Sequence, residues 1–410
     1  MKKLLALILA VAMMLVATSA MADIVICQNK VEIDGALQEY AAAYTAKTGV
    51  PVKVITGGGS SDYNTVLKAE MQSGREPDIW VIEGPTGYEL WKDKIADQTG
   101  AEWTKYTAAA YLDGDKVVGF PVSVEGYGLA YNADILAKAG IDPKTLTNVN
   151  AYKAAFEKLD SMKEELGLDA VVSMVAGTTT GMTWVTGLHN FNVYLTVGLD
   201  RNDTSVIDDV LAGKVQKERF HKYCEYVALL FKYSSQDMLL NGTQDSQLAA
   251  FINQKTAFYH QGNWMDPNIV TLNPQFEMAY APHAFLDEDT DGILVNAPSW
   301  YVVNANGNTQ EALDFLNALA TTEEGHDYMV NKAAMVPAFT NVTLTPSTPL
   351  SKSVMEWNAA GKTYSWQQYK LPDGFGMGTL GALYELLAAG TIDEPTFETM
   401  MTDAIASIGK

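Results

Sequence analysis

Hydrophobic and polar positions along the chain alternate between short apolar runs and longer amphipathic segments. The apolar runs at 24–27, 50–55 and 78–82 are typical of buried strands. Between them, residues 35–48 carry apolar side chains at helical spacing, and a second helix is expected over 62–71. This strand–helix–strand–helix–strand order predicts a parallel sheet covered by helices on both faces.

The same alternation continues through the rest of the chain. Further strands are expected at 116–120, 122–131, 170–175, 256–260, 276–281 and 293–304, and further helices at 150–166, 184–197, 220–233, 246–253, 309–319, 379–389 and 394–408. A chain of 410 residues is too long for one hydrophobic core, so two domains are expected. No low-complexity tether separates them, which indicates that the chain passes between the domains through strands.

The most informative stretch runs from 256 to 269. A buried strand ends at His260, Gly262 breaks the chain, and Asp266 followed by Pro267 predicts the start of a helix. Trp264 therefore lies between a strand's carboxyl end and a helix's amino end, where open α/β sheets bind ligands. An indole there could stack on a sugar ring, or it could simply fill a core.

The amino terminus is typical of a secretory signal peptide. Lys2 and Lys3 precede the apolar run 4–16, and Ala20-Met21-Ala22 fits a cleavage site after Ala22. A membrane anchor is disfavoured because the run is short. The chain is therefore expected to be exported to the periplasm or cell surface. The residues before Cys27 do not match a lipoprotein processing site, so no lipid anchor is predicted.

Charge and cysteine content exclude several classes of function. The formal net charge is -21, which opposes binding to nucleic acid or to an anionic membrane. Cys27 and Cys224 are the only cysteines, and two buried thiols are favoured over a disulfide. The acidic segment 286–292 matches a calcium loop only loosely, and the five histidines show no ligand spacing. No metal and no cofactor are expected.

An ordered set of short motifs resembles one family. These are 44–52, 73–79 ("SG..PDI"), 124–132 ("vE..gL.YN"), 262–264 ("GpW"), 311–316 and 336–338 ("iPa"). Together they resemble the extracellular solute-binding proteins of ABC transporters, family 1, whose branch includes maltodextrin- and other carbohydrate-binding proteins.

The resemblance implies an α/β fold of two lobes, each a mainly parallel sheet flanked by helices. The implied N-terminal lobe comprises 23–123 and 295–338, and the C-terminal lobe comprises 124–294 and 339–410, after the signal peptide 1–22. Two or three chain crossings would form a hinge, and the cleft between the lobes would close on the ligand.

A neutral sugar needs carboxylates and amides for its hydroxyls and aromatic rings for its apolar faces. The candidate ligand-binding residues, at strand ends and loops expected to face one crevice, are Asn29, Asp62, Tyr63, Glu83, Glu125, Trp184, Trp264, Asp266, Trp300, Trp366 and Phe375. Asp62 and Asp266 could equally be helix caps.

The resulting hypothesis is a monomeric, non-enzymatic component of an ABC importer. It would capture a neutral sugar or oligosaccharide and deliver it to the membrane permease. One alternative keeps the fold but binds a polyamine, which would suit the acidic surface. A second is an exported glycoside hydrolase with Glu83 and Glu125 as its carboxylate pair. No motif for a nucleophile elbow or a phosphate loop supports other catalysis.

Overall fold

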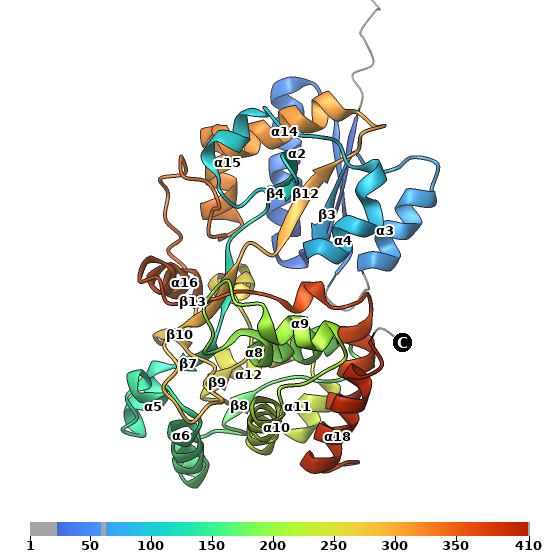
Figure 1. The fold of residues 1–410 in the computed structure, drawn as a ribbon. Coiled ribbons are helices and arrows are strands. Elements are labelled where there is room, and N and C mark those ends of the chain that lie inside the picture. Colours follow the sequence, from blue (N-terminus) through green and yellow to red (C-terminus); the bar gives the residue numbers. More distant parts are fainter. Residues whose placement is uncertain (1–22, 59–62, 409–410) are drawn as a thin grey trace, which may run out of the picture.

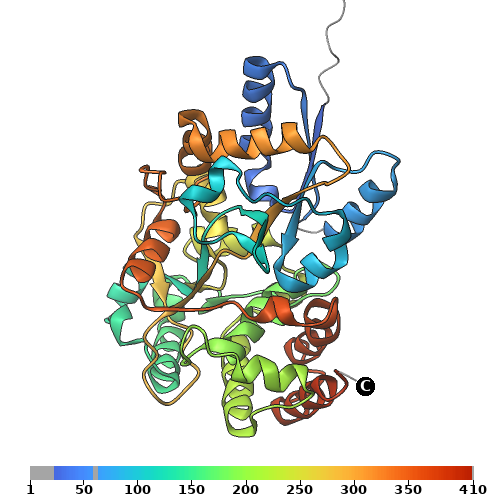
Figure 2. The same cartoon turned by 45° about the horizontal axis from the view of Figure 1, so that its top comes forward.

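The computed structural model describes residues 23–58 and 63–408, which form two lobes stacked one above the other (Figure 1). Both ends of the chain contribute to this arrangement. The orange segment around residues 300–335 lies in the upper lobe with the blue N-terminal elements, whereas the red C-terminal helices lie in the lower lobe (Figures 1 and 2). The predicted signal peptide 1–22 lies outside the described residues.

The upper lobe is built on a mixed six-stranded sheet of order β2-β1-β3-β12-β5-β4. Its strands are β1 (Ile24–Gln28), β2 (Val52–Thr56), β3 (Ile79–Glu83), β4 (Tyr111–Asp113), β5 (Lys116–Pro121) and β12 (Ser299–Val303). The first three pair in parallel, as the apolar runs predicted. Strand β12 lies antiparallel between β3 and β5, so a late part of the chain completes the sheet.

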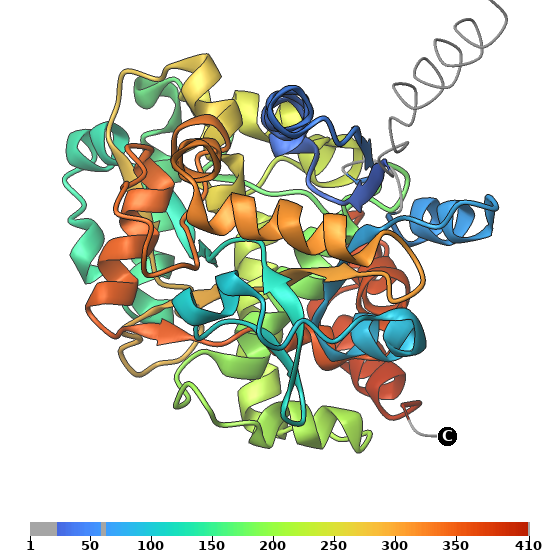
Figure 3. The same cartoon turned by 90° about the horizontal axis from the view of Figure 1, so that it is seen from above.

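Helices cover both faces of this sheet. They are α2 (Asp34–Thr48), α3 (Tyr63–Gln72), α4 (Gly84–Trp91), α14 (Thr309–Thr321) and α15 (Glu323–Asp327), with shorter helical turns η1 (Val31–Ile33), η2 (Lys92–Lys94), η3 (Glu102–Tyr106) and η7 (Tyr328–Lys332). On one face α2 packs against α14 through Tyr40 and Phe315, and from above α2 is seen end-on while α14 runs across the view (Figure 3). On the other face, Leu67 of α3 and Tyr88 of α4 pack on Trp80.

The lower lobe has a second mixed sheet of order β10-β7-β9-β8 inside a shell of helices. Its strands are β7 (Leu129–Asn132), β8 (Val172–Ser173), β9 (Phe258–Tyr259) and β10 (Met278–Ala281). Its helices are α5 (Ala133–Lys138), α6 (Val149–Ser161), α7 (Lys163–Leu166), α8 (Phe191–Thr196), α9 (Ser205–Leu211), α10 (Lys217–Lys232), α11 (Gln236–Asn241), α12 (Gln244–Ile252), α13 (Asp266–Leu272), α17 (Gly381–Ala388) and α18 (Glu394–Ile405). Shorter helical turns are η4 (Pro143–Thr145), η5 (Val185–Asn190), η6 (Asn263–Met265), η8 (Gln368–Lys370) and η9 (Phe375–Leu380).

A small three-stranded sheet joins the lobes. Strand β11 (Ile293–Asn296) pairs antiparallel with β6 (Glu125–Tyr127) and parallel with β13 (Thr363–Tyr364). Helix α16 (Pro349–Ala359) packs on this sheet through Val354, which contacts the core that includes Val295. The chain also approaches itself at the bridge between Val124 and Val336, so the lobes are joined by adjacent crossings.

The two-lobed α/β fold is therefore confirmed, but the expectation of mainly parallel sheets is corrected. In both lobes a strand entering from the hinge side, β12 above and β7 below, pairs antiparallel with its neighbours. The predicted lobe boundaries stay a prediction. Cys27 and Cys224 are both buried and unpaired, as the sequence favoured.

Candidate functional site

A cavity of about 290 Å³ lies between the lobes and is lined by both of them. The upper lobe contributes the carboxyl ends of β1 and β3 and the start of α3, and the lower lobe contributes the segment 181–189 and Trp264. We call it the central cavity. Its position agrees with the rule that strand carboxyl ends form ligand sites in α/β sheets.

The central cavity gathers six of the candidate residues: Asn29, Tyr63, Glu83, Glu125, Trp184 and Trp264. They come from six separate stretches of the chain, which only the folded lobes bring together. The candidate Asp62 lies outside the described residues.

Trp264 presents a half-buried indole to the central cavity. Its ring stacks on His189 at a centroid distance of 4.9 Å, and its Nε1 donates to Gln261 Oε1 at 3.1 Å. Gly262 permits this position because a Cβ there would collide with the indole ring. Trp184 lies edge-on to Trp264 at 6.1 Å, so two indoles line one wall. The π-faces of such rings suit the apolar faces of sugars.

Charged side chains line the opposite part of the cavity. The Lys30 ammonium forms an ion pair with Glu125 and lies 3.8 Å from Glu32. Burial lowers the pKa of Lys30, but the two carboxylates outweigh it, so the pKa rises above its ordinary value. Ser123 donates a further hydrogen bond of 2.8 Å to Glu125. Glu125 is thus held by an ion pair rather than left free.

Glu83 is the carboxylate with the weakest charge compensation in the described part of the cavity. Its Oε1 accepts a hydrogen bond of 3.0 Å from Asn29 Nδ2, and it also contacts Tyr369. Burial raises the pKa of Glu83 to about 7, against the attraction of Lys30. At neutral pH its carboxyl group is therefore partly protonated, and it can both donate and accept hydrogen bonds.

Sequence reasoning missed several residues that line the central cavity, among them Lys30, His189, Gln244 and Tyr369. Lys30 directly follows the first strand, so the strand-end criterion that selected Asn29, with Glu32 nearby, could have included it. Tyr369 carries no such signal, because it comes from a late segment that folds back into the cleft. His189 is held neutral, since burial lowers its pKa well below the ordinary value.

Four candidates are corrected by their positions outside the cavities. Asp266 is fully buried, and its carboxylate accepts the backbone N–H of Ser351 (2.6 Å) and Leu350 (3.3 Å) at the start of α16. Asp266 therefore caps the start of α16 rather than the start of α13, the helix to which it belongs. Trp300 donates its Nε1 to the Ala109 carbonyl at 2.7 Å and packs edge-on against Tyr111 of β4.

The other two corrections are core aromatics of the lower lobe. Trp366 is 6% exposed and packs behind Trp264 and Tyr127, whereas Phe375 is 8% exposed at the start of η9. Both residues belong to segments close to the cleft, as the sequence predicted, but their side chains pack into the core of the lower lobe.

Two further cavities adjoin the central one. The first, of about 390 Å³, lies between α4 and η8 and shares Tyr63, Glu83 and Tyr369 with the central cavity. We call it the η8-side cavity. The second, of about 1080 Å³, lies beside α13 and shares Val31, Glu32 and Gln244. We call it the α13-side cavity. Each of the two therefore borders the central cavity through shared lining residues.

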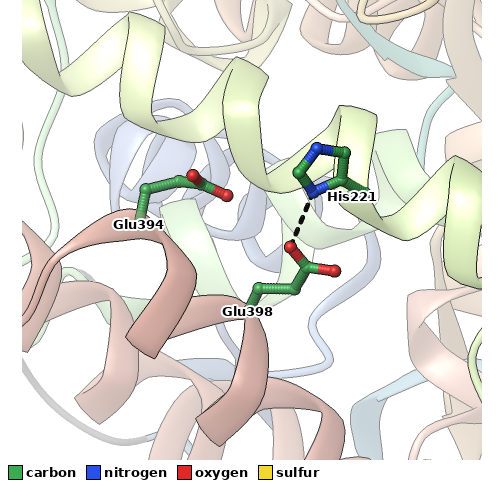
Figure 4. Close-up of side chains that lie close together, drawn as sticks. All are labelled: His221, Glu394 and Glu398. Carbon is green, nitrogen blue, oxygen red and sulfur yellow. Dashed lines mark hydrogen bonds and ion pairs between the residues drawn. The ribbon is translucent and has the colours of Figure 1, made fainter.

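Away from the cleft, one cluster has atoms close enough to ligate a metal. His221 of α10 and Glu394 and Glu398 of α18 place one ligand atom each within 4.8 Å of one another (Figure 4). The sequence did not show it because its members come from two helices. His221 Nδ1 lies 2.7 Å from Glu398 Oε2, and this hydrogen bond raises the pKa of His221. This contact is that of a surface ion pair joining two helices.

Within residues 23–58 and 63–408, no helix is long and apolar enough to cross a membrane. The chain resembles the melibiose/raffinose/stachyose-binding protein MelE of Bacillus subtilis, with 22% identity over 294 residues. That match covers 69% of this chain and 66% of MelE, so the chain spans just under two thirds of that relative.

Two solved structures share the fold over nearly the whole chain. RafE in complex with raffinose has a TM-score of 0.78 and 15% identity, and the match covers 95% of this chain and 100% of RafE. A sugar transporter protein of Bacillus licheniformis in complex with stachyose has a TM-score of 0.72 and 17% identity, covering 93% of this chain and 100% of that one. Finally, the family model for bacterial extracellular solute-binding proteins matches residues 39–360, and the chain belongs to that family.

Proposed function

We propose that this protein is the exported substrate-binding component of an ABC importer, and that it captures a neutral oligosaccharide between its lobes. The observation that carries the proposal is the central cavity, where Trp184 and Trp264 face hydrogen-bonding groups that include Glu83 and Asn29. Indoles for ring faces and carboxylates for hydroxyls are the two groups that an uncharged sugar requires. The similar proteins support the same class, because MelE is a melibiose/raffinose/stachyose-binding protein and the two solved structures hold raffinose and stachyose.

In this proposal the protein binds without catalysis. The ligand would contact both walls of the central cavity at once, so binding favours the arrangement in which the lobes meet. The closed form would then dock on the permease. Glu125 serves as a hydrogen-bonding group paired to Lys30 rather than as a nucleophile. The protein acts as a monomer, with the signal peptide removed after Ala22 and no lipid at Cys27.

A thermal shift panel tests the proposal. Monosaccharides and oligosaccharides of several linkages are added to the mature protein, because a ligand that binds only the folded state raises its melting temperature. At a concentration of about 100 times Kd, the stabilisation is about 2.7 kcal/mol. No shift with any neutral sugar would contradict the proposal.

A matched pair of tryptophan variants locates the binding site. Trp264→Leu removes an indole from the central cavity, and we expect it to abolish the shift caused by the active sugar. Trp300→Leu removes an indole that lines none of the three cavities, and it should retain the shift. Equal loss in both variants would place the binding elsewhere.

One observation favours a second candidate, a polyamine. Among the described residues, the central cavity is lined by three carboxylates, Glu32, Glu83 and Glu125, and by one ammonium, that of Lys30. A cationic ligand would compensate the excess negative charge. Spermidine in the same panel separates the two candidates: a shift with spermidine and none with sugars would select the polyamine.

A further inference from the structure

The central cavity is small compared with the cleft to which it belongs. Its volume of about 290 Å³ lies at the lower end of the range of small-molecule sites. A ligand with several sugar rings must therefore leave it on one of two sides, through the η8-side cavity or the α13-side cavity.

The lobes are already in contact on the η8 side. The Thr86 hydroxyl of α4 lies 3.1 Å from the carbonyl oxygens of both Tyr369 and Leu371. Gly84, with φ of +63°, lies so close that a Cβ would come within 2.5 Å of the Tyr369 Cβ. Contacts between the two lobes thus narrow this exit.

The α13 side is wider, and its walls also come from both lobes. The upper lobe supplies η1 and the end of η7, and the lower lobe supplies α12 and α13. The cavity measures about 1080 Å³ and shares the lining residues Val31, Glu32 and Gln244 with the central cavity. A chain of sugar rings can run from one cavity into the other between these shared residues.

Uncharged polar side chains of the α13-side cavity suit a ligand rich in hydroxyl groups. Asn268 and Thr271 of α13 and Asn331 of η7 line this cavity, and Gln244 is shared with the central cavity. Amides and hydroxyls of this kind donate to and accept from sugar hydroxyls without adding charge. Exposed Val270 and Leu272 offer apolar surface beside them. The charged side chains of the lining are those of Glu32, Asp245 and Lys332. The η8-side cavity, in contrast, is much smaller, and its lining mixes apolar side chains such as Leu67 and Trp91 with polar ones such as Glu89 and Gln368.

We propose that the α13-side cavity is an extended subsite for the distal rings of an oligosaccharide whose terminal ring occupies the central cavity. The proposal rests on the proposed function. It adds the side of the cleft along which the ligand extends and the contribution of the distal rings to affinity. The protein recognises one end of its ligand closely and gains affinity from the rings that lie along α13.

Calorimetric titration with two length series tests the subsite. The first series is galactose, melibiose, raffinose and stachyose, and the second is glucose, maltose, maltotriose and maltotetraose. In the series that binds, we expect the affinity to rise at least about tenfold from the monosaccharide to the trisaccharide, since tenfold corresponds to 1.4 kcal/mol. Equal affinities at all lengths would overturn the subsite.

A matched pair of variants locates the distal contacts. Thr271 and Thr399 are both exposed helical threonines whose hydroxyls donate to the carbonyl of a proline four residues earlier. Thr271→Trp fills part of the α13-side cavity, whereas Thr399→Trp makes the same change on α18. We expect Thr271→Trp to weaken binding of tri- and tetrasaccharides at least about fivefold, while mono- and disaccharides bind within about twofold of the unmodified protein.

Two further variants serve as checks. Thr399→Trp should leave all affinities unchanged, and Asn268→Ala should give a smaller loss of affinity that is confined to the longer sugars. If Thr271→Trp weakens all lengths equally or none, the subsite is wrong, although sugar binding stands. If no sugar of either series or of the thermal shift panel binds, the proposed function itself has failed.

Discussion

Glu83→Gln tests the electrostatics of the cleft directly. Glu83 ends β3 and faces the central cavity beside Lys30 and Glu125. Burial raises its pKa from 4.5 to about 7. Glutamine keeps the shape of the side chain and an oxygen that can accept the hydrogen bond from Asn29, but it carries no charge at any pH. The substitution therefore removes one titratable group from the cleft and changes little else.

The direction of the effect follows from linkage. A carboxyl group whose pKa is higher in the folded state binds its proton more tightly there, so it stabilises the fold below pH 4.5. That stabilisation is lost as the pH rises through about 7. A rise of the pKa from 4.5 to about 7 corresponds to at most about 3 kcal/mol. Glu83 is partly exposed, so solvent screens its charge and we expect about 1–2 kcal/mol.

The assay is urea unfolding of the unmodified protein and Glu83→Gln at pH 5 and pH 8. From pH 5 to pH 8, the free energy of unfolding of Glu83→Gln should rise relative to the unmodified protein by about 1–2 kcal/mol. The comparison between proteins is necessary because other groups titrate as well. Burial lowers the pKa of His260 to about 4, for example, and this destabilises both proteins in acid.

Glu39→Gln is the control, since it makes the same change on the exposed face of α2. Its stability relative to the unmodified protein should be the same at both pH values. The reasoning is refuted if Glu83→Gln shows no difference between pH 5 and pH 8, or a difference of opposite sign.

Three further predictions concern other parts of the structure. Asp266→Ala leaves two buried N–H groups of α16 without an acceptor, so urea unfolding should show a loss of about 1–3 kcal/mol; Asp393→Ala, at the exposed cap of α18, should lose less, and equal losses would contradict the buried cap. Gly84→Ala should separate η8 from α4 and increase the radius of gyration in X-ray scattering, because alanine disfavours the positive φ and its Cβ meets Tyr369; an unchanged radius would argue against the contact. Cys27 and Cys224 are buried, and burial raises the pKa of Cys27 to about 12, so neither thiol should react with a disulfide reagent at pH 8 until urea is added.

The sequence predicted the parts of the fold and site that depend on local pattern. The strand carboxyl ends at Asn29 and Glu83 and the loop at Trp264 could be found because apolar runs end there and turn residues follow. Residues whose role depends on distant packing could not. Tyr369 reaches the cavity only because the segment after β13 folds back across α4.

The same limit explains the corrections. Asp266 precedes a proline and so looked like the cap of its own helix or a ligand group, but its oxygens accept from α16, more than 80 residues later in the chain. Trp366 and Trp264 are both tryptophans near the cleft, and only the side toward which each ring turns distinguishes core from cavity wall. A linear pattern carries no information about that choice.

The central position of β12 in the upper sheet has a consequence for synthesis. Until residues 299–303 have been made, β3 and β5 have no strand between them, and the sheet exists only as two separate pieces with open edges. The lower lobe likewise waits for α17 and α18, near the end of the chain. Neither lobe can therefore reach its final form on the ribosome before most of the polypeptide has been translated.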